Sequence, residues 1–338
     1  MTTAKKHIAE YKTEILTGIR PTGNLTVANF LGAVKPLIEL QEQGERPLAF
    51  VADLHALTDN EPKEVQKYVH EVVADYIALG VDPKKTHLFL QSSIEGEIAT
   101  LTLLLARHTN VSELLRVPTL KDKLKGNARP ETANALLFLY PVIMAADILI
   151  QRAHKVPVGE DQVAHIEFAR EVARDFNKKY GEVFPLPQPL EQKSIRILSL
   201  KGEGKMSKSQ PSGALFLTDD QNTIEKKIKG AETAFEGKMT AQLESHILVA
   251  KGLSKTEKDR QEIDAIVEKH KKGEPMMGEF KKVFTRITQK FVKEFQEKKS
   301  TITKDPAFIP SVLAEGTKIA KANATETLQD VKRAMKYG

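Results

Sequence analysis

The 338-residue sequence contains no cysteine, and this absence excludes several kinds of chemistry at once. Disulfides, zinc–thiolate sites, iron–sulfur clusters and thiol nucleophiles all need that side chain. Long apolar runs are also missing, because no stretch approaches the ~18 to 20 residues that cross a bilayer. The polar segment 1–12 lacks the apolar core of a signal peptide. We therefore expect a cytoplasmic protein with no membrane partner.

Length and charge set only broad limits. A chain of 338 residues exceeds one average domain, and 41% hydrophobic with 28% charged residues supports a sizeable core. The 51 basic and 45 acidic side chains give a net charge of +6. This excess permits a polyanionic partner and fits a solvated basic surface equally well. We expect one large α/β unit with a smaller appendage.

A strand, a turn and a helix follow one another near the N-terminus. An apolar run covers 15–19, Pro21 and Gly23 mark the turn, and apolar residues at helical spacing begin at Leu31. Such a turn aims free backbone N–H groups at the helix N-terminus, where a phosphate binds well. The turn is a nucleotide-site candidate, although an ordinary connection explains this stretch by itself.

Further apolar strands alternate with helices along the first two thirds of the chain. Strands are predicted at 47–53, 86–91, 156–162 and 194–200, the last closing the sheet, with helices at 61–79 and 165–177. This alternation is typical of a doubly wound parallel sheet. A helical insertion interrupts it at about 97–135, and the pattern is helical throughout 218–338. We therefore predict an α/β domain over 1–217 followed by an all-helical domain.

Asp147 is the only charge in the apolar segment 136–150. Burying an unpaired carboxylate costs several kcal/mol, so this residue needs a partner. An internal salt bridge or helix cap is one interpretation, and a donor group on a ligand is the other.

Two further segments carry groups suited to a nucleotide. Gly159 permits close approach of a ligand to the backbone, and Glu160 and Asp161 offer acceptors for ribose hydroxyls. Asp161 and His165 also have a spacing that can ligate a metal, but no third ligand is near, so a surface helix pair is the better interpretation. The basic loop 121–130 either contacts phosphate or is solvated.

The order Lys-Met-Ser-Lys-Ser at 205–209 follows the last predicted strand. A solvated loop is the usual explanation for two lysines at this spacing. On a mobile glycine-rich loop, however, the two lysines can close over a triphosphate and stabilise the charge that grows as pyrophosphate leaves.

Together these motifs resemble the signature pair of the class I aminoacyl-tRNA synthetases. More narrowly, the chain resembles the bacterial-type tryptophanyl-tRNA synthetases over nearly its whole length. Five blocks carry the resemblance: Gly18–Gly23, Phe138–Ile150, Val156–Gln162, Lys205–Ser209 and Thr223–Lys229.

The resemblance implies a fold, a reaction and partners. The fold is a Rossmann-like catalytic domain with the insertion at the interface of a homodimer, followed by a helical domain that binds the anticodon. The reaction converts L-tryptophan and ATP, with Mg²⁺, to tryptophanyl-adenylate and pyrophosphate. The tryptophanyl group is then transferred to the 3'-terminal adenosine of tRNA(Trp).

The resemblance also implies roles for individual residues. Lys205, Lys208, Thr26 and Asn29 are the expected catalytic residues, and Ile197 is expected to contact adenine through its backbone. Asp147 would accept the indole N–H, and no side chain is assigned to the metal, because Mg²⁺ would be held mainly by the ATP phosphates. The remaining pocket residues expected for tryptophan are Met144, His55, Val156, Val158 and Gln162. The remaining residues expected for ATP are Arg20, Pro21, Thr22, Ala28, Gly159, Glu160, Asp161, Met206, Ser207 and Ser209, together with Asn29, Lys205 and Lys208.

The chemistry of the residues agrees with this assignment. Indole nitrogen is only a donor, so a fixed acceptor in an apolar pocket selects it against a ring that lacks the N–H. The substrate carboxylate is already ionised and needs no general base, so alignment and charge stabilisation carry the reaction.

Two departures from the family pattern leave alternatives open. The signature at 26–29 reads Thr-Val-Ala-Asn, with the Ala28 methyl where glycine is usual, and Arg20 stands where many relatives have glutamine. A tyrosyl enzyme is one alternative, since a phenol also donates. A catalytically weakened paralogue that acts as a binding or regulatory module is another. A small nucleotidyltransferase would leave the helical C-terminal region unexplained.

Overall fold

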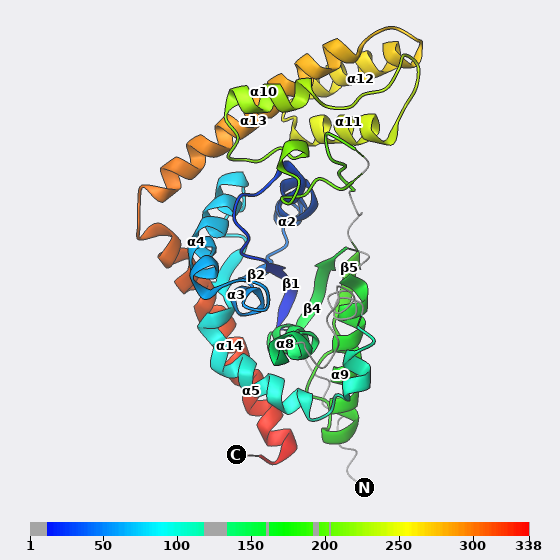
Figure 1. The fold of residues 1–338 in the computed structure, drawn as a ribbon. Helices are drawn as coiled ribbons and strands as arrows, with labels where there is room; N and C mark the ends of the chain where they lie inside the picture. The colour runs from blue at the N-terminus through cyan, green and yellow to red at the C-terminus, as the bar shows by residue number, and fades with distance from the viewer. Residues whose placement is uncertain (1–11, 118–133, 160–161, 192–195, 203, 338) are drawn as a thin grey trace.

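The computed structural model describes residues 12–117, 134–159, 162–191, 196–202 and 204–337. Within these ranges, five parallel strands form one sheet in the order β3-β2-β1-β4-β5 (Figure 1). The strands are β1 (Thr13–Ile19), β2 (Leu48–Val51), β3 (His87–Leu90), β4 (Ala153–Val158) and β5 (Gln188–Glu191). The strand order reverses direction between β1 and β4, which confirms the predicted doubly wound fold.

Helices and short helical turns connect the strands. Near the N-terminus a π-helical turn, η1 (Phe30–Val34), joins α1 (Val27–Asn29) to α2 (Lys35–Glu42). The others up to β5 are α3 (Asp53–Ala56), α4 (Pro62–Leu79), η2 (Gln91–Ile94), α5 (Glu95–Ala106), α6 (Val111–Leu114), α8 (Ala135–Ile150) and α9 (Val163–Tyr180). After β5 come η5 (Pro211–Gly213), α10 (Gln221–Lys229), α11 (Ala241–Leu253), α12 (Glu257–Lys271), α13 (Met277–Thr303) and α14 (Phe308–Met335).

Two hydrophobic cores lie on opposite faces of the sheet. Along β2, Ala49 and Val51 belong to the core shared with α4, α11 and α13. Leu48 and Phe50 alternate with them and belong to the core shared with α5, α8 and α9. Because neighbouring side chains of a strand point to opposite faces, this alternation places helices on both sides of the sheet.

The C-terminal helix α14 covers the edge strand β3. Its first part contributes Leu313 to one core and its later part contributes Ala324 to the other. The helix approaches so closely that a Cβ atom at Gly316 would lie 2.0 Å from the carbonyl oxygen of Leu88. Glycine is therefore required for this contact, which shields an edge that could otherwise pair with another chain.

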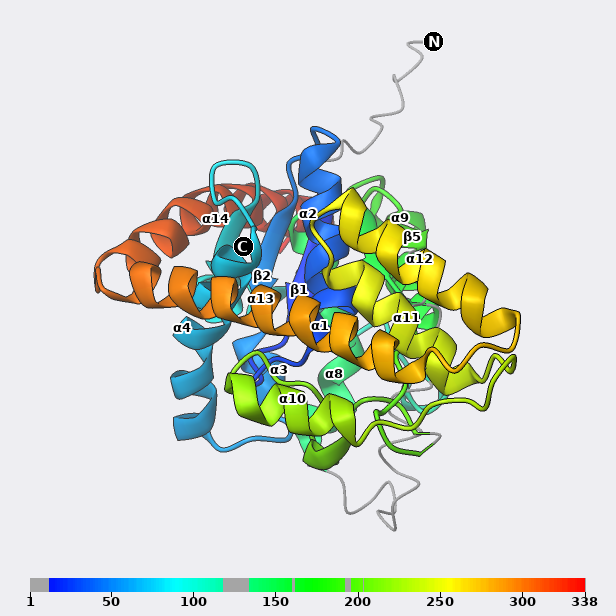
Figure 2. The same ribbon diagram turned by 90° about the horizontal axis from the view of Figure 1, so that it is seen from above.

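The preceding helices α10 to α13 form a group of their own, seen from above in Figure 2. Side chains cap three of them: Asp220, Thr240 and Thr256 each accept a hydrogen bond from the backbone N–H three residues later. The apolar stripe of α13, which includes Phe284 and Phe291, faces the core. This group lies in the segment predicted as helical, and the domain boundary near residue 217 stays a prediction.

The strand predicted at 194–200 is wrong for its described residues, 196–200. The backbone of this stretch bonds elsewhere: Met206 N–H donates to the Ile197 carbonyl, and Leu198 N–H donates to the Ser245 hydroxyl of α11. Leu198 makes only an isolated antiparallel bridge with Lys205. The sheet ends instead at β5, where Pro189 is tolerated because the strand lies at an edge.

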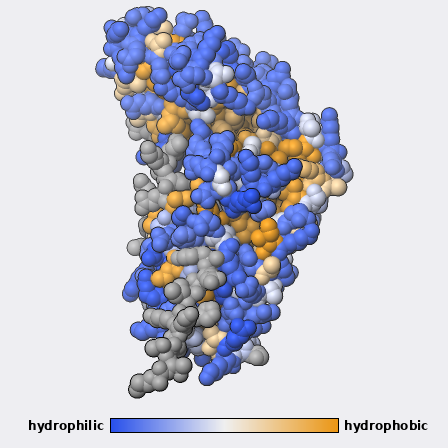
Figure 3. All heavy atoms as spheres, turned by 180° about the vertical axis from the view of Figure 1, so that it is seen from behind, coloured by the Kyte–Doolittle hydropathy of each residue, from blue (hydrophilic) through white to orange (hydrophobic). Residues whose placement is uncertain are grey.

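The predicted insertion contains α5 and α6, and its residues 118–133 lie outside the described ranges. The face behind the view of Figure 1 is mostly hydrophilic, with apolar side chains gathered toward its middle (Figure 3). Among the described residues, none of the helices is both long enough and apolar enough to cross a bilayer.

Candidate active site

A cavity opens between the carboxyl ends of β1 and β4. The two strands pair at their starts, Thr13 with Ala153 and Ile15 with Lys155, and their pairing does not continue beyond Ile15. The other edge of β1 pairs with β2 from Leu16 to Ile19. The strands therefore part at the point where the strand order reverses, which is where doubly wound sheets bind ligands. The cavity has a volume of about 370 Å³.

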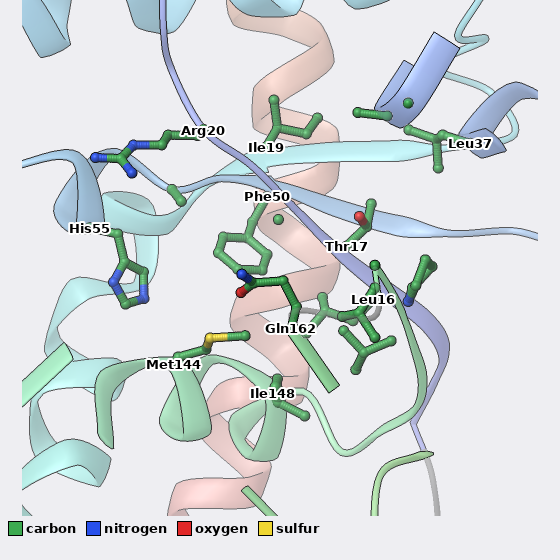
Figure 4. Close-up of a pocket in the computed structure, with 18 of the residues that line it drawn as sticks. Leu16, Thr17, Ile19, Arg20, Leu37, Phe50, His55, Met144, Ile148 and Gln162 are labelled. Carbon is green, nitrogen blue, oxygen red and sulfur yellow. The ribbon is translucent and has the colours of Figure 1, made fainter. Parts of the chain in front are cut away.

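The cavity walls are largely apolar. Figure 4 shows His55, Met144 and Arg20 at one end and Thr17 and Leu37 at the other. Five of the six residues predicted to hold tryptophan line this space: His55, Met144, Val156, Val158 and Gln162. The lining also includes residues that sequence reasoning did not single out for this role: Phe50, Tyr140 and Ile148.

Asp147, the sixth predicted residue, lies directly behind the cavity wall. It is 4% exposed, and its carboxylate accepts hydrogen bonds from Nε2 of His55 at 2.9 Å and from Nε2 of Gln91 at 2.8 and 2.9 Å. Burial raises the pKa of Asp147 above its ordinary value, and the hydrogen bonds from His55 and Gln91 oppose this rise. The buried acid thus has the internal partners that its sequence context required.

Gln91 was not identified from the sequence. It follows β3 directly, and Asp53 comes two residues after the end of β2, so both lie just beyond strand ends of the parallel sheet. Applying the strand-end rule to the third strand as well would have found it.

The signature at 26–29 forms the start of α1. The hydroxyl of Thr26 accepts from the backbone N–H of Asn29 at 3.2 Å, and the Asn29 side chain accepts from the Thr26 backbone N–H at 3.0 Å. This reciprocal capping box brings the two predicted catalytic residues together and holds the helix start. Ala28 is half-buried beside them.

The lysine loop, residues 205–209, lies against the turn that follows β1. The Lys208 ammonium donates to the Thr22 hydroxyl at 2.9 Å, to the Thr22 carbonyl at 3.2 Å and to the Gly23 carbonyl. Burial lowers the pKa of Lys208 below its usual value, and the charge of Asp75 opposes this shift. Lys205 is exposed, and Ser207 and Ser209 hydrogen bond to each other through their hydroxyls.

The remaining residues predicted to contact ATP fall into three sets. Arg20, at the rim of the cavity, forms an ion pair with Asp59, and Gly159 also lines the cavity. Pro21 is buried in the turn, and Met206 is buried at the start of the lysine loop. Glu160, Asp161 and the basic loop 121–130 lie outside the described residues.

A family model described as class I tRNA synthetases (W and Y) matches residues 9–293. The chain belongs to this synthetase family. The family prediction made from the five sequence blocks is therefore confirmed.

Individual relatives resemble the synthetase over nearly its full length. The tryptophan–tRNA ligase of Caldanaerobacter subterraneus subsp. tengcongensis is 38% identical over 331 residues, covering 95% of this chain and 97% of the relative. That of Chlamydia caviae is 34% identical, covering 95% and 94%. The solved tryptophanyl-tRNA synthetase of Campylobacter jejuni complexed with ADP and tryptophan is 30% identical, with a TM-score of 0.81 over 95% of this chain and 99% of that one.

Proposed function

We propose that this synthetase is a tryptophan–tRNA ligase. The observation that carries the proposal is the apolar cavity between β1 and β4, with the buried carboxylate of Asp147 behind its wall. Indole needs an apolar slot and offers a single donor, so a fixed acceptor at the end of the slot selects it. The names of the relatives in two bacteria and the tryptophan complex of a third support the same substrate.

In the first step, a carboxylate oxygen of tryptophan attacks the α-phosphorus of ATP. A bond forms between that oxygen and phosphorus, and the bond to the bridging oxygen breaks, releasing pyrophosphate. We propose that Lys208 and Lys205 stabilise the charge that develops on the leaving group. Lys208 is already held at the turn after β1, and Lys205 is three positions away on the same loop.

The groups proposed to bind ATP are backbone, hydroxyls and lysines. Thr22 lies in the turn after β1 beside Lys208, Asn29 lies in α1, and Gly159 follows β4 and lines the cavity. Magnesium in this proposal is carried mainly by the ATP phosphates. Among the described residues, no cluster of three or more histidine and acidic side chains is arranged to hold a metal ion.

In the second step, a hydroxyl of the terminal adenosine of tRNA attacks the adenylate carbonyl and releases AMP. The helices α10 to α13 and their lysines are proposed to contact the anticodon. A homodimer is proposed through the insertion, where two large apolar side chains are exposed, Leu103 at 70% and Val111 at 61%. Light scattering of the purified protein tests the dimer.

Transfer of tryptophan to tRNA tests the proposed function. We expect radiolabelled tryptophan to appear in acid-precipitable tRNA(Trp) in the presence of ATP, and radiolabelled tyrosine not to appear in tRNA(Tyr). The reverse result supports the tyrosyl alternative, which a phenol donor to Asp147 would explain. Failure with both amino acids supports a weakened paralogue that serves as a binding module.

A further inference from the structure

Gln91 is a buried residue beside His55, which lines the cavity. It begins η2 immediately after β3, and it is 0% exposed. Its side chain links two residues of the candidate site: Nε2 donates to both oxygens of Asp147, and Oε1 accepts from the backbone N–H of His55 at 3.2 Å. From these contacts we infer that Gln91 is a positioning residue that fixes Asp147 as the acceptor for the indole N–H of tryptophan.

The two ends of the Gln91 amide cannot exchange places. The backbone N–H of His55 requires an oxygen opposite it, and the Asp147 carboxylate requires a donor. A flipped amide would place oxygen against carboxylate and nitrogen against an N–H group. The orientation of Gln91 is therefore set at both ends, and a side chain so constrained holds its partners in one arrangement.

Counting acceptor positions indicates which oxygen of Asp147 remains open to a ligand. Each carboxylate oxygen has two lone pairs. Among the residues that the structure describes, Oδ2 receives the hydrogen bonds from His55 and Gln91, while Oδ1 receives only the one from Gln91. One acceptor position on Oδ1 is therefore left for the substrate ring.

The charged and titratable groups near Asp147 lie on α3 and α8. On α3, His55 bonds to it and the charge of Asp53 acts on it, and Tyr140 lies about two turns earlier on α8, the helix that carries Asp147. No Lys or Arg hydrogen bonds to or pairs with Asp147 among the described residues. The neutral amide of Gln91 therefore supplies two of its three hydrogen bonds without adding charge.

This inference rests on the proposed function and deepens it, because it explains how the ring N–H is distinguished. Without Gln91, the Asp147 carboxylate is held only at Oδ2, by His55, among the described residues, so Oδ1 can turn away from the ring. Tryptophan should then lose its advantage over the analogue in which sulfur replaces the ring N–H. Binding of ATP, for which other residues are proposed, should not change.

The experiment compares tryptophan with that sulfur analogue. The chain contains no tryptophan, so the fluorescence of bound tryptophan can be followed without background from tryptophan residues of the protein. The analogue is measured by its displacement of tryptophan. We expect the wild-type protein to prefer tryptophan at least roughly 100-fold, and Gln91→Leu to reduce this preference by about 10-fold or more.

Gln151→Leu is the matched control. Gln151 is also 0% exposed, and its side chain bonds to the Ala320 carbonyl and to Asn323, away from the cavity. Like Gln91→Leu, this variant replaces a buried, hydrogen-bonded glutamine by leucine, and we expect a comparable loss of stability. We expect it to leave the preference for tryptophan unchanged.

Gln91→Glu separates positioning from packing, because the shape of the side chain is kept. The introduced carboxyl group and Asp147 would share a proton, and while that proton is present the introduced group still donates to Asp147. As pH rises and the proton leaves, the donor is lost and the two charges repel. Tryptophan affinity should therefore fall with rising pH in this variant, whereas in the wild type it should rise or stay level.

Two outcomes overturn the inference. If folded Gln91→Leu protein keeps the full preference for tryptophan, or if Gln91→Glu follows the wild-type pH profile, Gln91 does not position Asp147. These results leave the proposed function standing. A wild-type protein that binds both ligands equally would instead overturn the proposed function together with this inference.

Discussion

The ammonium nitrogen of Lys208 lies 2.9 Å from the hydroxyl oxygen of Thr22, a residue 186 positions earlier in the chain. This contact joins the two motifs on which the nucleotide site was predicted. The turn after β1 supplies oxygens, and the lysine loop supplies the cation that they hold. Because these oxygens are neutral, the phosphates of ATP would attract the same ammonium more strongly. The contact therefore defines a position from which the Lys208 side chain can move to the phosphates.

Replacing Lys208 by alanine should slow activation more than it affects folding. Removing one group that stabilises charge in the transition state typically costs roughly 100-fold or more in rate. The folded state loses hydrogen bonds from a charged donor, worth about 1.5 to 3 kcal/mol, but it also loses the cost of burying that charge, which is the cause of the lowered pKa of Lys208. Single-turnover formation of the adenylate measures the first effect, and urea unfolding measures the second. The exposed Lys293, replaced by alanine, is the control. A Lys208→Ala protein with normal activation would exclude the proposed role.

Replacing Asp147 by asparagine should weaken tryptophan use and spare ATP use. Asparagine keeps the shape, but its nitrogen would face the donors of Gln91 or His55. A hydrogen bond to a charged group is worth about 1.5 to 3 kcal/mol, so the KM for tryptophan should rise roughly 10- to 150-fold. Steady-state pyrophosphate exchange measures both KM values. Equal losses for tryptophan and ATP would indicate a structural role instead.

Tryptophan affinity should depend on pH through Asp147. The ionised carboxylate is the better acceptor for the ring N–H, and burial raises its pKa above the ordinary value. Affinity should therefore be at its maximum above this raised pKa and should fall as the pH decreases through it. The fall should begin at a higher pH than for an aspartate of ordinary pKa. Fluorescence titration of tryptophan at a series of pH values measures this. In Asp147→Asn the dependence should disappear, and its persistence would assign it to another group.

The contact of α14 with β3 gives a prediction about stability. Gly316→Ala places a methyl group 2.0 Å from the Leu88 carbonyl oxygen, so the helix must move, at a cost of about 1 to 3 kcal/mol in the free energy of unfolding. Gly278→Ala is the matched control, because a Cβ there meets no atom within 4 Å. In a helix that change should be neutral or stabilising by up to about 1 kcal/mol. Chemical denaturation compares the two, and equal effects would contradict the close approach.

Much of the sheet could be predicted from the sequence because the information is local. Apolar runs at strand length alternate with helical patterns such as the one that ends at Gly80. They were sufficient to predict β1 to β3, but the fourth strand, predicted at 156–162, overlaps β4 (Ala153–Val158) only at 156–158. The fifth strand was missed because Pro189 disguises it, whereas 196–200 has the apolar pattern of a strand. Tertiary contacts decide the structure of 196–200. The Ser245 hydroxyl of α11 and the Met206 N–H bond to backbone groups of this stretch that a sheet would need.

The site was predicted less completely, for a related reason. The lone charge of Asp147 showed that a partner was needed, but nothing local showed which one. Gln91 is 56 positions away and His55 is 92 positions away, and only the sheet brings them together. The resemblance to a family supplied roles for residues that physical reasoning alone left with two interpretations.

The central claim is that the cavity selects tryptophan for activation by ATP. Pyrophosphate exchange, measured with each of the twenty amino acids supplied singly, tests it most directly. We expect rapid exchange with tryptophan and, at most, slow exchange with tyrosine or phenylalanine. Exchange supported best by any other amino acid, or no exchange with tryptophan, would contradict it.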